Sequence, residues 1–116
     1  MDSSRIERTI SSEDSFVNRV FSEAERTNAP ADGQERLNWF AGRFAVKEAV
    51  FKALRSEADK VTFSEIETLR NESGAPFVTL YGQTKIIAEE AGVVTIHVSL
   101  ANEKGLMIAF VVAEII

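Results

Sequence analysis

The sequence predicts an α+β domain in which a small antiparallel sheet packs on a long central helix. Residues 37–54 repeat apolar side chains at helical spacing, residues 94–101 alternate apolar and polar side chains, and residues 106–113 are apolar throughout. Turn-forming residues join the strand-like segments into hairpins. Because no linker, repeat or low-complexity tract interrupts the chain, residues 1–116 are predicted to form a single domain.

The central helix is expected to begin after Gly33 and to run to about Arg55. One face carries Leu37, Phe40, Ala41 and Phe44, and the same face continues to Glu48, Phe51 and Lys52. Further apolar residues surround the cylinder, so the helix should be largely enclosed. Glu48 and Lys52 are therefore expected to be semi-buried charges.

The shorter elements follow from caps, turns and alternation. Ser11 or Ser12 is a good N-cap, Ser22–Glu25 has the spacing of a capping box, and Gly92 is the glycine expected just past a helix. Leu106–Ala113 is apolar on both faces, which predicts a central strand. In chain order we expect a helix at 12–20, a helical turn at 22–25, a loop at 27–33, strands at 61–69 and 77–81 joined by a turn at 71–74, a helix at 83–91, and strands at 94–101 and 106–113 joined by a turn at 102–105.

Composition limits the classes of partner. The formal net charge of -5 argues against nucleic acid or an anionic membrane as the main partner, since both require a positive surface. The absence of cysteine excludes disulfides, thiolate metal sites and cysteine nucleophiles. No apolar run reaches the ~20 residues of a membrane span, and the N-terminus lacks a signal-peptide pattern. A cytoplasmic location is the default expectation.

Glu48 and Lys52 form the candidate reactive pair. On an exposed helix such a pair adds only ~0.2–0.5 kcal/mol, so the spacing alone carries little information. On a sheet-facing stripe, however, two charges require a local partner such as a cation or a phosphate. Glu48 could ligate Mg²⁺, with Asp2 as a candidate second ligand, and Lys52 could neutralise a phosphate or move a proton.

Other ionisable residues can be explained without a functional role. Asp2 is most simply explained as a solvated N-terminal acid. His97 could act as an acid or base, although a lone strand histidine is more often structural. Arg43 and Lys47 are expected on the more open side of the helix, where solvation would explain them.

The central helix resembles a known family. Ala41-Gly-Arg-Phe-Ala-Val-Lys-Glu-Ala-Val-Phe-Lys-Ala53 is similar to the (R/G)RFAxKEAxxKA helix of the holo-[acyl-carrier-protein] synthases, the small phosphopantetheinyl transferases. The segment from Phe16 to Glu25 resembles the helix and turn F-x-x-R-x-F-T/S-x-x-E of that family. Phe63–Glu67 with Gly74-Ala-Pro76 resembles its hairpin, and Ile96–Ala101 resembles its H-V-S-[IL] strand.

The resemblance implies the 4'-phosphopantetheinyl transferase fold and its reaction: transfer of the phosphopantetheine arm of coenzyme A to a serine of apo acyl carrier protein, with release of adenosine 3',5'-bisphosphate. It implies that Mg²⁺ bridges the pyrophosphate and that the family's trimer places active sites between subunits. By residue, it implies that Asp2 and Glu48 ligate the metal and that Lys52 contacts the transferred phosphate and assists proton movement. It implies that Arg43 and Lys47 face coenzyme A. The residues that it implies for contact with the carrier are Arg8, Phe16 and Arg19.

The sequence departs from the family pattern at three places. Only Met1 precedes Asp2, where family members have a short apolar strand; an excised domain or a misplaced start is compatible with this. In an alternative register, Arg5-Ile6-Glu7 matches the family's R-I-E and the aspartate lies outside this sequence. The loop at 55–60 is shorter and lacks the family's glycines, and Leu100-Ala-Asn102 replaces a serine/threonine-histidine of many members. A non-catalytic member that binds carrier protein or coenzyme A is the alternative function.

Overall fold

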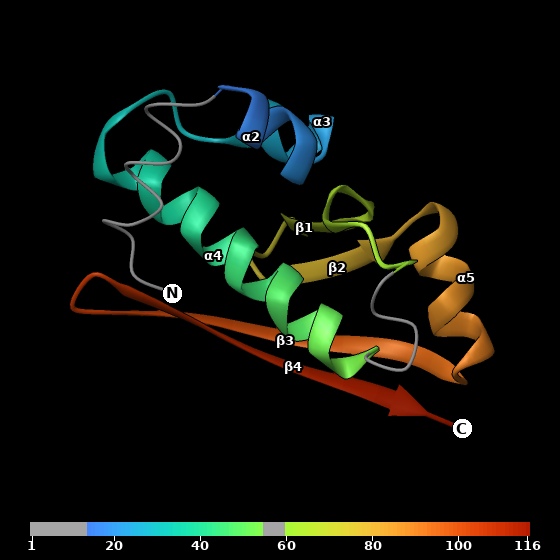
Figure 1. Cartoon of the computed structure of the whole chain (residues 1–116). Helices are drawn as coiled ribbons and strands as arrows, with labels where there is room; N and C mark the ends of the chain where they lie inside the picture. The colour runs from blue at the N-terminus through green and yellow to red at the C-terminus, as the bar shows by residue number, and fades with distance from the viewer. Residues whose placement is uncertain (1–13, 55–59) are drawn as a thin grey trace.

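The computed structural model describes residues 14–54 and 60–116. In chain order, it contains α2 (Asp14–Val20), α3 (Glu23–Asn28), α4 (Gly33–Ala53), the 3₁₀ helix η2 (Phe63–Glu65), β1 (Ile66–Arg70), β2 (Pro76–Leu80), α5 (Gly82–Glu90), β3 (Val93–Glu103) and β4 (Leu106–Ile115). Helix α4 runs through the middle, with the β3–β4 hairpin on one side and α2, α3 and β1 on the other (Figure 1).

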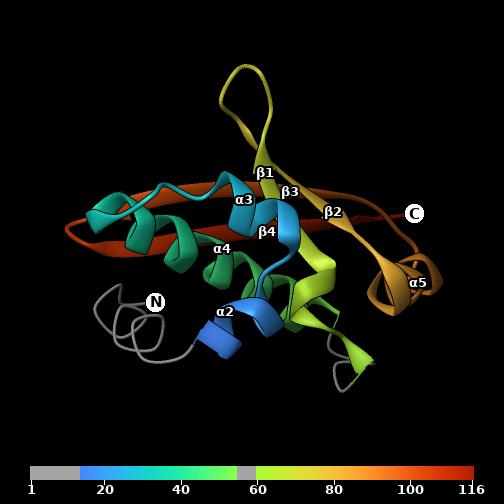
Figure 2. The ribbon, with the colours of Figure 1, turned by 90° about the horizontal axis from the view of Figure 1, so that it is seen from above.

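The strands form two antiparallel hairpins, one from β1 and β2 and one from β3 and β4. In the first, Thr68 pairs with Val78; in the second, Leu100 pairs with Ala109. The tip of the β1–β2 hairpin projects away from the rest of the molecule (Figure 2). No helix in the described part of the chain is long and apolar enough to cross a membrane.

Two hydrophobic clusters hold these elements together. The first joins α2, the first half of α4 and one residue of β4, and consists of Val17, Phe21, Phe40, Ala41 and Met107. The second joins the end of α4 to β1 and α5, and consists of Val46, Val50, Leu54, Ile66, Ile87 and Ala88. Helix α4 contributes to both clusters, which confirms the prediction of a largely enclosed central helix.

Most predicted elements are present, with bounds that differ by a few residues. The capping box is formed: Ser22 Oγ accepts from the Glu25 amide, and the Glu25 carboxylate accepts from the Ser22 amide. The predicted strand at 61–69 begins with η2, so only its second half is extended. The predicted helix at 12–20 is described from Asp14 onward, and residues 12 and 13 lie outside the described residues.

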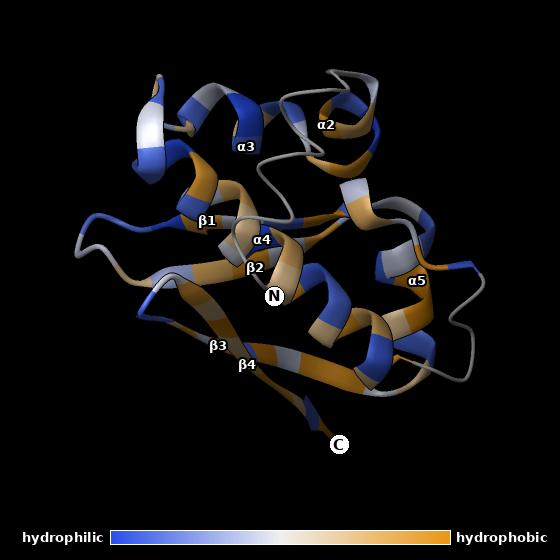
Figure 3. Ribbon diagram, turned by 60° about the vertical axis from the view of Figure 1, so that its left-hand side comes forward, coloured by the Kyte–Doolittle hydropathy of each residue, from blue (hydrophilic) through white to orange (hydrophobic). Residues whose placement is uncertain are grey.

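Among the residues that the structure describes, β4 is an edge strand and not the central strand that was predicted. Among the described residues it pairs only with β3, and its side chains alternate between two environments. Met107, Ala109 and Val111 face the core, whereas the large apolar residues between them are exposed: Leu106, Ile108, Phe110 and Val112. Figure 3 shows that much of this hairpin consists of hydrophobic residues. The described part of the chain leaves the outward-facing ones exposed.

Gly82 at the start of α5 generates a stability prediction. Its φ is +56°, and an added Cβ would overlap Glu65 Oε2 and lie 2.8 Å from Glu65 Cδ. Glu65 cannot easily move aside, because its Oε1 accepts from the amide and hydroxyl of Thr84 and so caps this helix. Gly82→Ala is therefore expected to lower the free energy of unfolding by about 2–4 kcal/mol, combining backbone strain with overpacking.

Gly74 provides the matched control, measured by urea unfolding. Its φ is +87°, and no atom lies within 4 Å of an added Cβ. Gly74→Ala should therefore show the backbone cost alone, about 1–2 kcal/mol. Equal losses in the two variants would mean that the Glu65 carboxylate does not restrict position 82.

Candidate active site

Glu48 and Lys52 lie one turn apart on α4 and line a groove between this helix and the start of β4. Ala45 and Ala49 give the helix side of the groove only small side chains, which leaves a space of about 290 Å³. Residues 106–109 form the opposite wall. The two charged residues predicted to act together therefore share one face of the helix and one opening.

The two side chains differ in exposure. Glu48 is half-buried, as predicted, whereas Lys52 is exposed near the end of the helix, so the prediction of a semi-buried Lys52 was wrong. Within the described parts of the chain, neither side chain forms an ion pair or hydrogen bond with another residue. No described residue therefore competes with a ligand for either group.

The groove fits a cation that needs few protein ligands. Within residues 14–54 and 60–116, no group of three or more His, Asp or Glu side chains could hold a metal by itself. Mg²⁺ commonly takes only one or two carboxylates and completes its octahedron with water and substrate phosphates. The Glu48 carboxylate, which pairs with no described residue, suits it. Asp2, the predicted second ligand, and Arg8, a predicted carrier contact, lie outside the described residues.

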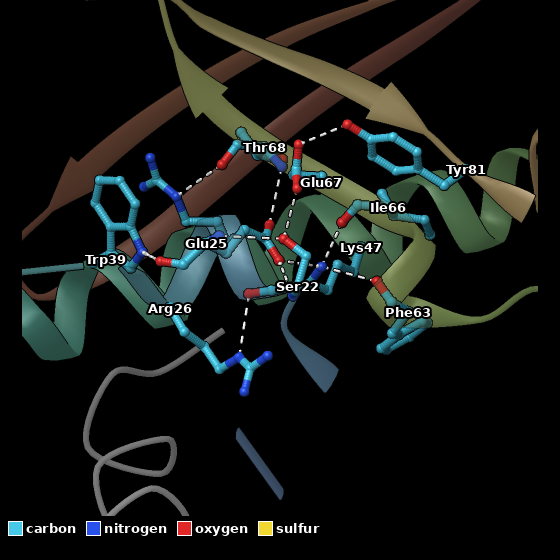
Figure 4. A network of polar contacts seen from close by, with 11 residues as sticks. Ser22, Glu25, Arg26, Trp39, Lys47, Phe63, Ile66, Glu67, Thr68 and Tyr81 are labelled. Carbon is cyan, nitrogen blue, oxygen red and sulfur yellow. Dashed lines mark hydrogen bonds and ion pairs between the residues drawn. The ribbon is translucent and has the colours of Figure 1, made fainter. Parts of the chain in front are cut away.

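Lys47 precedes Glu48 but lies on another side of α4, where it is fully buried (Figure 4). Its ammonium donates to Glu25 Oε1 and to the Phe63 carbonyl, both at 2.8 Å, and also to the Ile66 carbonyl. These acceptors use all three donors of a lysine. The prediction that Lys47 lies on the open side of the helix was wrong, because acceptors of its own chain enclose the amine. Its predicted contact with coenzyme A stays a prediction.

Glu25 connects the Lys47 ammonium to two further elements. Its Oε1 also accepts from the Ser22 amide at 3.0 Å, and its Oε2 accepts from the Thr68 amide of β1 at 2.9 Å. Burial lowers the pKa of the Lys47 ammonium from its usual 10.5, and the adjacent Glu25 carboxylate opposes that shift. The ion pair thus joins α3, α4 and β1 at one buried point.

Arg43 is also buried, so the prediction of an open position for this residue was wrong too. Its guanidinium carbon lies 3.3 Å from the centroid of the Trp39 ring, and Nε donates to the Thr68 carbonyl at 3.3 Å. Burial and then the positive charge of Arg70 lower the pKa of Arg43 from 12.5 to about 10, so it stays charged at neutral pH. Its Nη2 has no hydrogen-bond partner among the described residues.

Glu67 extends the polar network toward the surface. Ser22 Oγ donates to Glu67 Oε2 at 2.8 Å, and the Tyr81 hydroxyl donates to Glu67 Oε1 at 3.0 Å (Figure 4). Glu67 itself is buried, whereas the Tyr81 side chain is 47% exposed. The hydrogen bond to this carboxylate raises the pKa of Tyr81 above its usual value of 10.

The predicted carrier contacts that the structure describes both lie on α2. Arg19 is exposed, and its Nε donates to the Ser15 carbonyl of its own helix at 3.3 Å. Phe16 is half-buried, and its ring centroid lies 6.0 Å from that of Phe44 on α4. Aromatic contacts continue through Phe63 to Phe51, the residue before Lys52. A row of phenyl rings therefore connects the α2 surface with the end of α4.

His97 lies away from this site. It is on the outer face of the β3–β4 hairpin, where its Nε2 is 3.0 Å from Glu114 Oε1 across the strand pair. Both side chains are more than half exposed. The structural reading of His97 fits this position better than an acid or base role in the groove.

Sequence reasoning missed the acidic partners of the buried network. Glu25 was recognised only as the end of a capping box and of a family motif. Glu67 was named only within the family's hairpin motif, and Tyr81 was given no role. Local spacing could not reveal them, because Glu25 meets Lys47 across 22 residues and Ser22 meets Glu67 across 45. The available signal was a lysine at position 47 inside an otherwise apolar helix, which requires a buried acceptor.

The fold and this helix agree with one protein family. The family model described as the 4'-phosphopantetheinyl transferase superfamily matches residues 1–111. The chain therefore belongs to the 4'-phosphopantetheinyl transferase superfamily. This confirms the resemblance seen in residues 41–53.

Individual relatives are similar over most of their length. The holo-[acyl-carrier-protein] synthase of Lachnoclostridium phytofermentans is 40% identical over 101 residues, which cover 87% of this chain and 80% of that protein. The enzyme of the same name from Dehalococcoides mccartyi is 43% identical over 99 residues, covering 85% and 79%.

Solved structures of this family share the fold. The Helicobacter pylori holo-[acyl-carrier-protein] synthase in complex with coenzyme A matches 98% of this chain and 95% of its own, with a TM-score of 0.81 and 25% identity. An ACPS–CoA complex from Chronobacterium ammoniagenes matches 98% and 93%, with a TM-score of 0.83 and 27% identity. The predicted α+β fold with a long central helix is confirmed.

Tyr81 offers a direct test of the network, because it is the only tyrosine of the chain. Its phenolate absorbance is expected to titrate above pH 10 in the folded protein and at about pH 10 in urea. The folded state then holds its proton to higher pH than the unfolded state. The Tyr81 contribution to stability is therefore complete below pH 10 and is lost as the pH rises through the folded-state pKa.

Glu67→Gln is the control for this titration, since it removes the charge that holds the phenol proton. The Tyr81 midpoint should move down toward 10 in this variant. A wild-type midpoint of 10 while circular dichroism still shows the folded state would contradict the contact with Glu67.

Proposed function

We propose that this chain transfers the 4'-phosphopantetheine arm of coenzyme A to a serine of an apo acyl carrier protein in a Mg²⁺-dependent reaction. A new bond forms between the serine oxygen and the phosphorus that carries pantetheine, and the pyrophosphate bond to adenosine 3',5'-bisphosphate breaks. The observation that carries the proposal is the open groove with Glu48 and Lys52, on a helix that lies within the family match. The relatives named as holo-[acyl-carrier-protein] synthases support it.

Within the proposed site, each residue has a role that its position allows. Glu48 would hold Mg²⁺, together with Asp2 in the register that places this residue at the metal, and bound Mg²⁺ would neutralise the pyrophosphate. Lys52, exposed at the open end of the groove, contacts the transferred phosphate and assists removal of the serine proton. Arg43 is proposed to face coenzyme A, and its buried Nη2 has no hydrogen-bond partner among the described residues. Lys47 is not assigned to coenzyme A, because its donors are used internally.

Carrier recognition is assigned to the α2 surface. Arg19 offers an exposed positive charge and Phe16 an apolar ring, which suits an acidic, amphipathic carrier helix. Arg8 is proposed as a further positive contact. Because this surface lies on a different element from the groove, varying carrier and coenzyme A concentrations separately measures the two sites. The cytoplasm remains the proposed location.

The outer face of the β3–β4 hairpin supports a homotrimer with sites between subunits. Phe110 is 72% exposed and Val112 59%, and Leu106 and Ile108 extend this apolar face toward the hairpin turn. An apolar surface of this kind on a small domain favours association with further copies. Leu106 and Ile108 also border the groove, so a copy packed on this face would lie beside Glu48 and Lys52.

The function is tested by incubating the protein with coenzyme A, Mg²⁺ and an apo carrier, and then measuring the intact mass of the carrier. We expect the mass to increase by one phosphopantetheine group, and Glu48→Gln to slow this transfer about a hundredfold or more. Glu90→Gln, which changes an exposed glutamate of α5, is the matched control and should not alter the rate. Carrier of unchanged mass with wild-type protein would favour the non-catalytic alternative, and a normal rate in Glu48→Gln would remove Glu48 from the site.

Phe110→Asp tests the assembly. A carboxylate on the apolar face should convert the trimer to monomer in analytical ultracentrifugation and reduce transfer, because the groove would lose its neighbouring subunit. Ile86→Asp places the same charge on an exposed apolar position of α5 and should leave the trimer intact. A wild-type monomer with full activity would overturn the assignment of sites between subunits.

A further inference from the structure

The ion pair between Glu25 and Lys47 binds no proposed substrate, yet it holds the helix that carries the reactive groups. Lys47 is the immediate neighbour of Glu48 in α4, and both members of the pair are fully buried. The Lys47 ammonium has three acceptors, which come from α3, η2 and β1. The pair therefore fixes the middle of α4 against three separate elements.

Stability alone is a weak explanation for such a pair. Removing two charges from water is costly, and apolar residues of similar volume are often as stabilising as a buried ion pair. An ammonium with three matched acceptors also fixes the rotation of the helix about its own axis, because all three hydrogen bonds form in only one position of the ammonium. The apolar contacts of α4 do not fix this rotation in the same way.

The rotation of α4 determines where Glu48 and Lys52 point, because the positions of side chains around a helix are fixed relative to one another. Successive residues lie about 100° apart around an α-helix, so fixing the direction of Lys47 also fixes that of Glu48. Lys52, one turn after Glu48, follows the same rotation. A side-chain group about 6 Å from the helix axis moves by about 1 Å when the helix rotates by about 10°. A displacement of that size can reduce turnover by up to about a hundredfold.

The groove side of the helix cannot supply this constraint. Ala45 and Ala49 present only methyl groups there, and Glu48 and Lys52 have no ion pair in the described parts of the chain. The other polar contacts of this stretch are on the buried side with Lys47, where Arg43 bonds to β1. The rotation of the reactive segment is therefore set from the opposite side of α4.

We propose that Glu25 and Lys47 are positioning residues, which hold α4 in the rotation that directs Glu48 and Lys52 into the groove. This inference rests on the proposed transferase function and deepens it. Glu25 acts from α3 and Lys47 from the buried side of α4. Neither residue contacts substrate or metal.

Glu25→Asp is the sharpest test, because it keeps the charge and shortens the side chain by one carbon–carbon bond, about 1.5 Å. We expect turnover to fall about tenfold and the Mg²⁺ concentration for half-maximal rate to rise severalfold. The KM for coenzyme A should stay within about twofold of wild type. Ile87→Ala, a core change in α5 outside the network and the groove, is the control for lost stability alone and should keep wild-type turnover while folded.

The double variant Glu25→Gln/Lys47→Met separates positioning from stability. It removes both charges, so it should be more resistant to urea than Lys47→Met alone, which leaves a buried carboxylate unpaired. Turnover of the folded double variant should nevertheless stay ten- to a hundredfold below wild type. The inference would be overturned if the double variant or Glu25→Asp had the same turnover as the control variant Ile87→Ala.

Two other results would also overturn it. A raised KM for coenzyme A with unchanged turnover would show that Lys47 contacts the coenzyme, as the sequence had suggested. Wild-type protein that transfers no phosphopantetheine would overturn the proposed function and this inference with it. If the wild-type protein is active and the variants have the same turnover, the positioning inference is overturned but the proposed function is not.

Discussion

The structure depends on one constraint: a lysine inside an apolar helix must find three acceptors. Lys47 finds them in Glu25, Phe63 and Ile66, and each acceptor belongs to a different element. Glu25 in turn accepts from the amides of Ser22 and Thr68, so its carboxylate also caps α3 and reaches β1. Elements far apart in sequence are thereby fixed against the middle of α4, between its two hydrophobic clusters.

Four charged residues of helix α4 form two pairs with different surroundings. Arg43 and Lys47 are one turn apart and point inward, where Thr68, Trp39 and Glu25 receive them. Glu48 and Lys52 are also one turn apart, but they line an open groove without partners in the described structure. Lys47 and Lys52 thus have opposite surroundings on one helix. The Lys47 ammonium is satisfied by the chain itself, whereas Glu48 and Lys52 have no partner among the described residues.

Much of the fold was predictable because it depends on local signals. The capping box at Ser22, the helical spacing from Leu37 onward and the alternation from Val94 are patterns of a few residues, and the structure contains each. The strand predicted at 61–69 failed at its start, because its apolar residues did not alternate cleanly and residues 63–65 form a 3₁₀ turn instead.

The candidate site was predictable only in part. The position of Glu48 and Lys52 on an apolar helix stripe singled out the pair, and the family resemblance suggested its chemistry. The burial of Arg43 and Lys47 was not predictable, because α4 is apolar around most of its circumference and so has no stripe that marks the inward side. That side was decided by Glu25, Phe63 and Thr68, whose positions result from the tertiary fold.

The misassigned strand β4 and the open groove have a common cause. A strand that is apolar on both faces suggests a place inside a sheet, yet the described residues cover only the face with Met107 and Ala109. Leu106 and Ile108 on the other face are exposed and at the same time form part of the groove wall. Burial of an apolar surface that is exposed to water is favourable, and a second copy of the chain that buried it would also exclude water beside Glu48. Association and the electrostatics of the groove are then coupled, because the charges would interact more strongly once water is removed.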